Sequence, residues 1–307
     1  MEITERQADT EVDAASTICE DLAMLTKARL STLVAVTSLF GYLLAACAHS
    51  TFDWWVFGHT VLGTLLAAFG AAAFNQMIEV DADARMERTM IRPLPSRRIS
   101  KDAACVLGSL LSALGVLHLA IKVGFVPAGY ALATLVVYLF VYTPMKRRST
   151  WNTVAGAVAG ALPPLIGWTA GNGGFTAGAV FLFLLLFLWQ MPHFLAINWM
   201  YRDQYVAGGF VMWSNDDDDG SKTSRLAVVY SLGTLLLPLL PVLSGEARWW
   251  FLIPGIGLGL VMVMYSVKFR RDRVRKKARA LFFYTLAYLP LLLIFSLLAW
   301  KRLNGAE

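Results

Sequence analysis

Long apolar runs limit the fold of this 307-residue chain more than any other feature. Each run has about 17–25 residues, which is the length of helix that crosses a bilayer. Inside a bilayer the backbone must satisfy its own hydrogen bonds, so each run predicts a transmembrane α-helix. Nine runs are present, at about 30–48, 55–78, 103–121, 125–143, 153–170, 176–200, 226–243, 249–267 and 281–300. We therefore predict an all-α, polytopic membrane protein with nine transmembrane helices.

Two of these runs contain prolines. In the fifth run, Gly156, Gly160 and Gly167 are spaced to let helices approach closely, and the tandem prolines at 163–164 predict a kink. The sixth run is interrupted by the proline-containing step Trp189–His193, where we expect the helix to break.

Lysine and arginine are unevenly distributed. All but four of the 27 lie in the N-terminal tail or after the second, fourth, sixth and eighth runs; the exceptions are Lys122, Arg248, Lys301 and Arg302. Basic residues stay on the cytoplasmic side, which predicts a cytoplasmic N-terminus and a C-terminus outside. The expected layout is a cytoplasmic tail (1–29) without an evident signal peptide, one transmembrane domain (30–300) and a short non-cytoplasmic tail (301–307).

The net charge of +6 raises the question of a nucleic-acid partner, above all at 268–279, which holds eight basic residues. This segment lies between two predicted spans, where basic residues face anionic lipid. We therefore expect a lipid-facing cytoplasmic loop and no nucleic acid.

An acidic motif stands where the second run meets a basic segment. Asn75, Glu79 and Asp83 are four residues apart, so on a helix they share one face. Oxygen ligands of this kind suit Mg²⁺, which binds a few carboxylates together with substrate phosphates. Arg88 and Arg92 follow one helical turn apart, and guanidinium groups match phosphate geometry. The pattern predicts a diphosphate site at the membrane surface; the alternative is a helix end that leads into a salt-bridged loop.

Two further polar features leave alternatives open. His193 lies at membrane depth near Gln190 and Asn198, and it is either a functional group or a hydrogen-bonded packing residue. The run 216–219 has four aspartates but lacks the ligand spacing of a calcium loop, so we expect a solvated turn.

Four motifs together carry a resemblance to a known family. They are LTKARLSTLV at 25–34, NQMIEVDADARMERTMIRPL at 75–94, YTPMKRRSTWNTVAGAVAGALPPLIGW at 142–168, and WQMPHFLAINWMYRDQYVAGG at 189–209. On these motifs the chain resembles the UbiA superfamily of intramembrane prenyltransferases, in its haem-farnesylating branch. The resemblance covers about residues 25–300 and implies nine helices around a central cavity.

The resemblance also implies roles for particular residues. Asn75, Glu79 and Asp83 stand at the family's metal-binding motif, while Arg88, Arg92 and Lys146 match its diphosphate-binding residues. His193, Asp203 and Tyr205 match its second polar helix end, which is implied to bind substrate, either as the haem site or as a second polar motif. Three departures are noted: Glu79 replaces the usual aspartate, Gln204 stands where an acid is common, and Ala28 stands where proline is usual.

The implied reaction transfers the farnesyl group of farnesyl diphosphate to a vinyl group of haem B, with addition of water, to give haem O. Mg²⁺ is the implied cofactor. The implied location is the cell (inner) membrane, with a haem A synthase downstream. One alternative is a family member that acts on a quinone precursor or chlorophyllide, although the GALPPLIGW and MPHF segments disfavour it. Another is a transporter, since broken helices and midplane polar groups occur there too.

The basic residues make the orientation testable. A reporter fused after Glu307 should appear on the non-cytoplasmic side, because the basic segments hold their side of the protein in the cytoplasm. Paired reporters, one active inside and one active outside, measure this, and a fusion before Met1 is the control. A cytoplasmic C-terminus would mean that a span has been miscounted, with the interrupted sixth run the first to re-examine.

Overall fold

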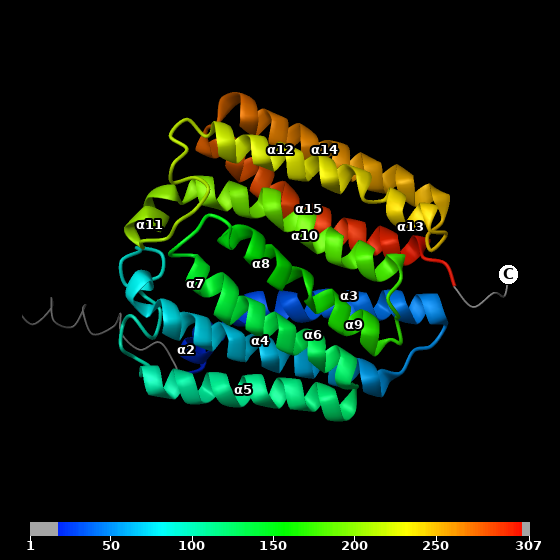
Figure 1. Ribbon diagram of the computed structural model, residues 1–307, viewed down its shortest axis with the longest axis horizontal. Helices are drawn as coiled ribbons and strands as arrows, with labels where there is room; N and C mark the ends of the chain where they lie inside the picture. Colours follow the sequence, from blue (N-terminus) through cyan, green and yellow to red (C-terminus); the bar gives the residue numbers. More distant parts are fainter. Residues whose placement is uncertain (1–17, 303–307) are drawn as a thin grey trace, which may run out of the picture.

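The computed structural model describes residues 18–302, and within that range nine helical segments are long and apolar enough to span a membrane (Figure 1). The predicted all-α transmembrane architecture is confirmed. The single-helix spans are α3 (Ala28–His49), α4 (Trp54–Asp83), α5 (Lys101–Lys122), α10 (Ala177–Met200) and α15 (Arg275–Ala299). The composite spans are α6 (Phe125–Val136) with the π-helical turn η1 (Val137–Tyr142) and α7 (Thr143–Met145), α8 (Asn152–Ala161) with α9 (Pro163–Ala170), α12 (Ser221–Leu236) with α13 (Leu239–Leu243), and the 3₁₀ turn η2 (Trp249–Phe251) with α14 (Leu252–Asp272).

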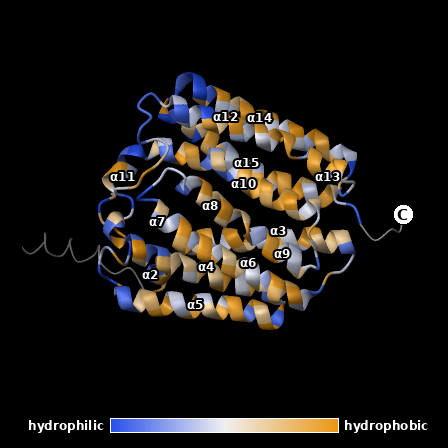
Figure 2. Ribbon diagram, viewed as in Figure 1, coloured by the Kyte–Doolittle hydropathy of each residue, from blue (hydrophilic) through white to orange (hydrophobic). Residues whose placement is uncertain are grey.

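Two short helices lie at the same end of the bundle, α2 (Ile18–Leu25) and α11 (Arg202–Ala207) (Figure 1). This end, the basic end, is formed by the segments 84–100, 146–151, 201–220 and 273–274. Hydrophilic residues gather there, whereas the helices between the ends are mostly hydrophobic (Figure 2). Helix α2 lies within the predicted N-terminal tail, 1–29. The rest of that tail up to residue 17, and residues 303–307 of the predicted C-terminal tail, lie outside the described residues. Which end faces the cytoplasm remains a prediction.

Small residues set the closest helix contact in the bundle. A methyl group added to Gly41 of α3 would lie 2.0 Å from the Pro164 carbonyl oxygen, and one added to Gly167 of α9 would lie 1.7 Å from the Ser38 carbonyl oxygen. No side chain fits at such distances, so α3 and α9 meet backbone to backbone. Gly160 of α8 is similar, because an added methyl would meet Gln190 Oε1 at 2.1 Å. The packing role expected for Gly160 and Gly167 is confirmed, and Gly41 is the partner on α3 that the sequence did not indicate.

The prolines act differently in the two runs that contain them. The fifth span divides at Leu162, directly before Pro163, as the tandem prolines predicted. The predicted break at 189–193 is wrong, because α10 continues through Pro192 without interruption. Pro192 removes only one backbone hydrogen bond, and its side chain is buried in the bundle.

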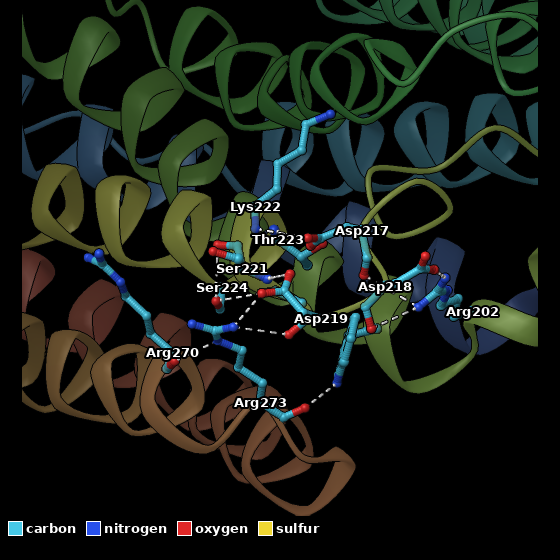
Figure 3. A network of polar contacts seen from close by, with 12 residues as sticks. Arg202, Asp217, Asp218, Asp219, Ser221, Lys222, Thr223, Ser224, Arg270 and Arg273 are labelled. Carbon is cyan, nitrogen blue, oxygen red and sulfur yellow. Dashed lines mark hydrogen bonds and ion pairs between the residues drawn. The ribbon is translucent and has the colours of Figure 1, made fainter.

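The aspartate run is a turn with exposed Asp216, Asp218 and Asp219, as expected, and it is also a hub of polar contacts (Figure 3). Asp217 is buried, and its carboxylate accepts hydrogen bonds from the backbone N–H groups of Lys222 (3.0 Å) and Thr223 (2.7 Å), which closes the start of α12. Asp218 pairs with Arg202 of α11, and Asp219 pairs with Arg273 at 2.6 Å. The ion pairs were not predicted, because the partner cations Arg202 and Arg273 lie far away in the chain.

The basic segment 268–279 is not the loop that the sequence suggested. Helix α14 continues to Asp272 and α15 begins at Arg275, so only Arg273 and Val274 separate them. The basic side chains therefore project from helix ends, where their positions are set by the backbone.

Loss of the Asp217 carboxylate should destabilise this end of the bundle. Burial by itself raises the pKa of Asp217, but the N–H groups of Thr223 and Lys222 lower it below its ordinary value. Asp217→Ala leaves two N–H groups of α12 unbonded, a change that costs about 1 kcal/mol in helix caps. Thermal denaturation in detergent should show a lower midpoint than for Asp216→Ala, an exposed neighbour. Equal midpoints for the two variants would contradict the capping role.

Candidate active site

The acidic motif lies on the last three turns of α4, and the structure keeps its three side chains on one buried face. The exposed fractions of Asn75, Glu79 and Asp83 are 0%, 5% and 1%. Helix α4 runs past the predicted apolar run, to Asp83, so the motif is helical as expected. Acidic groups are costly in such surroundings unless they are paired.

Each of the three side chains faces its own cationic side chain. Lys27 Nζ donates to Asn75 Oδ1 at 2.5 Å, and Lys146 Nζ donates to Glu79 Oε1 at 2.7 Å. At the end of the row, an Arg92 Nη donates to Asp83 Oδ2 at 2.6 Å. Lys146 and Arg92 balance the two carboxylates, and Lys27 adds positive charge when it is protonated, which suits an anionic ligand.

The cations come from three different segments, and each segment is held by its own contacts. Lys27 sits in the turn between α2 and α3 with a left-handed backbone (φ 47°). The side chain of Gln76, fully buried beside Asn75, fixes this turn by donating to the carbonyls of Met24 (2.6 Å) and Leu25 (2.9 Å).

Lys146 and Arg92 are held from outside α4. The Val211 N–H donates to the Lys146 carbonyl at 2.7 Å, which ties the end of α7 to the segment 201–220. The Thr89 hydroxyl donates to the Asp83 carbonyl at 2.9 Å and turns the chain back so that Arg92 faces Asp83. The site therefore depends on the whole basic end of the bundle.

Burial and charge act on the two lysines in different ways. Burial, together with the Arg92 and Lys146 charges, lowers the pKa of Lys27 to about 7. Burial also opposes the charge on Lys146, but Glu79, Tyr142 and Tyr138 outweigh it and raise the pKa of Lys146 above its usual value. These neighbours thus favour the charged form of Lys146.

Arg88 does not join Arg92, although the sequence placed them one helical turn apart. Helix α4 ends at Asp83 and the segment 84–100 forms successive turns, so that spacing has no helical meaning. The Arg88 guanidinium lies over the ring of Tyr201, 5.3 Å from its centroid. The two arginines therefore contact different neighbours at the same end of the bundle.

The structure also separates the three residues of the second motif. His193 lies between α10 and α15, with Nδ1 2.8 Å from Thr285 Oγ1 and its ring stacked on those of Trp189 and Phe282. Tyr205 packs with Phe210 beside the α4 site, and burial raises the pKa of its hydroxyl. Asp203 is exposed on α11.

Hydrogen-bond accounting indicates the proton position on His193. The Thr285 hydroxyl donates to the Phe282 carbonyl at 2.5 Å, so its oxygen is left to accept from His193 Nδ1. This places the proton on Nδ1 and the lone pair on Nε2. His193 thus has structural contacts and an available nitrogen as well.

Lys27, Gln76 and Thr143 were not predicted as site residues. The Thr143 hydroxyl accepts from Asn75 Nδ2 at 3.2 Å, which fixes the orientation of the amide. All three belong to quoted motifs, but only the fold brings 25–34 and 142–168 against α4. The one sequence signal for these residues was Lys27, a charged side chain shortly before the first apolar run.

The row of oxygen atoms is chemically suited to a magnesium ion. Asn75, Glu79 and Asp83 offer one amide and two carboxylates on one face of a helix, and Mg²⁺ needs few protein ligands when a substrate supplies phosphate oxygens. Within residues 18–302 no group of three or more His, Cys, Asp and Glu side chains forms a metal cage. The residues therefore fit a metal shared with a ligand rather than a closed site.

Comparison with known proteins decides the family. The model of the UbiA prenyltransferase family matches residues 34–297. This protein belongs to the UbiA prenyltransferase family. The resemblance drawn from the sequence motifs is thereby confirmed, and the buried row on α4 is the candidate active site of a UbiA prenyltransferase.

Individual UbiA relatives are similar over nearly their full length. A protoheme IX farnesyltransferase of Opitutus terrae is 42% identical over 89% of this chain and 92% of its own. Among solved structures, a digeranylgeranylglyceryl phosphate synthase has a TM-score of 0.77 at 14% identity, covering 92% of this chain and 98% of that one. A UbiA homolog from Archaeoglobus fulgidus bound to GPP and Mg²⁺ has a TM-score of 0.62 at 12% identity, with 90% and 98% covered. At these identities the structures establish the UbiA fold.

The Lys146–Glu79 pair should show the energetics of a buried ion pair. Lys146→Met leaves the Glu79 carboxylate buried without its partner, which costs about 3–5 kcal/mol in comparable sites. The double variant Glu79→Gln with Lys146→Met removes both charges and should recover much of that loss. Thermal denaturation in detergent measures both. A Lys146→Met protein as stable as the parent would show that the pair contributes nothing to stability.

Proposed function

We propose that this protein transfers the farnesyl group of farnesyl diphosphate to a vinyl group of haem B, with addition of water, to give haem O. The observation that carries the proposal is the buried row of oxygen side chains at the end of α4, with a cation opposite each. The similarity to a protoheme IX farnesyltransferase supports haem as the acceptor rather than a quinone precursor or chlorophyllide.

In this proposal the row on α4 binds the diphosphate end of the donor. Asn75, Glu79 and Asp83 hold Mg²⁺, which neutralises charge on the leaving diphosphate when bound. Arg88, Arg92 and Lys146 pair with the diphosphate oxygens. The structure of the Archaeoglobus fulgidus homolog, which is bound to GPP and Mg²⁺, supports this assignment.

The ion pairs explain how the buried carboxylates are tolerated before a ligand binds. Lys146 and Arg92 neutralise Glu79 and Asp83 when no ligand is present. With ligand bound, these carboxylates would hold the metal, and Lys146 and Arg92 would pair with the diphosphate. The same charges are paired before and after, so binding replaces one set of buried pairs with another.

The chemical step then depends on protection from water. The C–O bond to the diphosphate breaks, the haem vinyl group attacks the allylic carbon, and water adds to the resulting cation with release of one proton. Aromatic rings can stabilise positive charge in a dry site. Tyr142 and Phe210 line the diphosphate end, with centroids 4.5 and 5.7 Å from Lys146 Nζ.

Haem is proposed to lie on the α10 side, with His193, Asp203 and Tyr205 as its contacts. The available Nε2 of His193 is suited to a polar group or the iron of the acceptor. The protein is proposed to lie in the cell (inner) membrane with its basic end in the cytoplasm, and to supply haem O to a haem A synthase.

Incubation of the membrane protein with haem B, farnesyl diphosphate and Mg²⁺, followed by mass spectrometry of the haem, tests the proposal. Glu79→Gln and Asp83→Asn should each lower turnover by about 100-fold or more, because each removes a proposed metal ligand. Asp81→Asn is the matched control, since this α4 carboxylate is 76% exposed and pairs only loosely with Lys101 at 3.9 Å. Near-parental turnover of either site variant would refute the metal assignment, and absence of haem O with the parent protein would refute the function.

A further inference from the structure

A cavity with basic and aromatic walls opens at the basic end, between α10 and α15. Its volume is about 630 Å³. Arg275, Lys276 and Arg279 line one side, from the first turns of α15. Tyr201, Phe282 and Phe283 supply most of the remaining wall. We call this the α15 pocket.

The three cations of the α15 pocket have no ion pair with an acidic side chain in the described part of the chain. Neighbouring cations differ, since Arg273 pairs with Asp219 and Lys277 pairs with Asp272. Two of the three lie over aromatic rings instead: Arg275 is 5.8 Å from the Tyr201 centroid and Arg279 is 5.5 Å from that of Phe283. Such cations can bind carboxylates or phosphates without first breaking an ion pair.

The aromatic wall continues from the pocket toward the middle of the bundle. The Phe282 ring stacks on His193 with centroids 4.8 Å apart, and His193 stacks on Trp189 at 5.3 Å. The interplanar angles are 28° and 24°, so the three rings form a column. A flat, apolar ligand with acidic groups at one edge matches both the column and the pocket.

The α15 pocket also adjoins the candidate active site through a single ring. Tyr201 carries the Arg88 guanidinium at 5.3 Å and the Arg275 guanidinium at 5.8 Å. Arg88 belongs to the proposed diphosphate site, whereas Arg275 belongs to the pocket. A ligand in the pocket would therefore lie next to the diphosphate of the donor.

Resting on the proposed function, we infer that the α15 pocket binds the two propionate carboxylates of the haem acceptor. Arg275, Lys276 and Arg279 pair with the carboxylates, and the porphyrin plane extends along Phe282 toward His193. The vinyl groups, on the opposite edge of the macrocycle from the propionates, then point into the bundle, where the allylic carbon of the donor is expected.

An anionic phospholipid headgroup has the negative charge of the haem propionates but not the flat, apolar macrocycle. It needs only basic residues at the surface, whereas this pocket leads into a stacked aromatic column that ends at the polar pair His193–Thr285. The column favours a planar ligand, and the experiment separates the two sources of negative charge.

The test compares haem B with its dimethyl ester, which keeps the macrocycle and iron but lacks the negative charges. The protein is placed in nanodiscs of zwitterionic phosphatidylcholine, and binding is measured by absorbance. The parent should bind haem B at least about 10-fold more tightly than the ester, as expected for charge-assisted hydrogen bonds. Arg275→Gln with Arg279→Gln should abolish that difference and leave ester affinity and the KM for farnesyl diphosphate within about twofold.

Arg270→Gln with Arg271→Gln is the matched control, because these exposed arginines lie on α14 outside the pocket. It should keep the parental preference. Equal affinity of the parent for haem B and the ester would overturn the inference, as would equal loss of both ligands in the pocket variant. A third outcome would assign the pocket to lipid instead. In it, added phosphatidylglycerol abolishes the preference of the parent protein for haem B over the ester, whereas farnesyl diphosphate does not.

Turnover of the parent protein is measured in the same nanodiscs. Production of haem O without any preference for the diacid would refute the pocket and keep the proposed function. A clear preference for the diacid without production of haem O would do the reverse.

Discussion

The pairing of three cations with three buried oxygen side chains at the end of α4 is the interaction on which the functional end of the molecule depends. Carboxylates with 5% and 1% exposure are tolerated there only because Lys146 and Arg92 lie against them. Each cation arrives on a different segment, so the pairs also fasten the α2–α3 turn, the end of α7 and the segment 84–100 to α4. The charged side chains proposed to bind the ligand are therefore the same ones that hold this end of the fold together.

The remainder of the basic end is organised by the same kind of contact at lower burial. The hub at 217–219 closes α12 and holds α11 and the α14–α15 turn, with Asp217 as its one buried acid (Figure 3). This hub fixes the place where α15 begins, and hence where Arg275 and Arg279 project. Two sites with net positive charge result, separated by Tyr201.

A prenyltransferase must hold the diphosphate of its donor at the membrane surface and must keep the allylic carbon of that donor away from water. The arrangement meets both needs, because hydrophilic residues gather at the basic end while the helices behind them are mostly hydrophobic (Figure 2). Close contacts at Gly41 and Gly167 join α3 to α9 without bulky side chains between them. The aromatic column from Phe282 to Trp189 brings one polar side chain, His193, into this hydrophobic interior.

The sequence alone determined the nine spans, the family and the face of α4 that carries Asn75, Glu79 and Asp83, because hydropathy and helical spacing are local properties. It misjudged the α10 break and the spacing of Arg88 and Arg92, and it did not foresee the ion pairs of the aspartate run, since proline effects, ion pairs and turns depend on neighbours distant in the chain. Only the tertiary structure brought Lys27 to Asn75, 48 residues away, and parted His193 from Tyr205. Long-range pairing leaves no periodic trace in a sequence, so the partners of the predicted acids had to come from the fold.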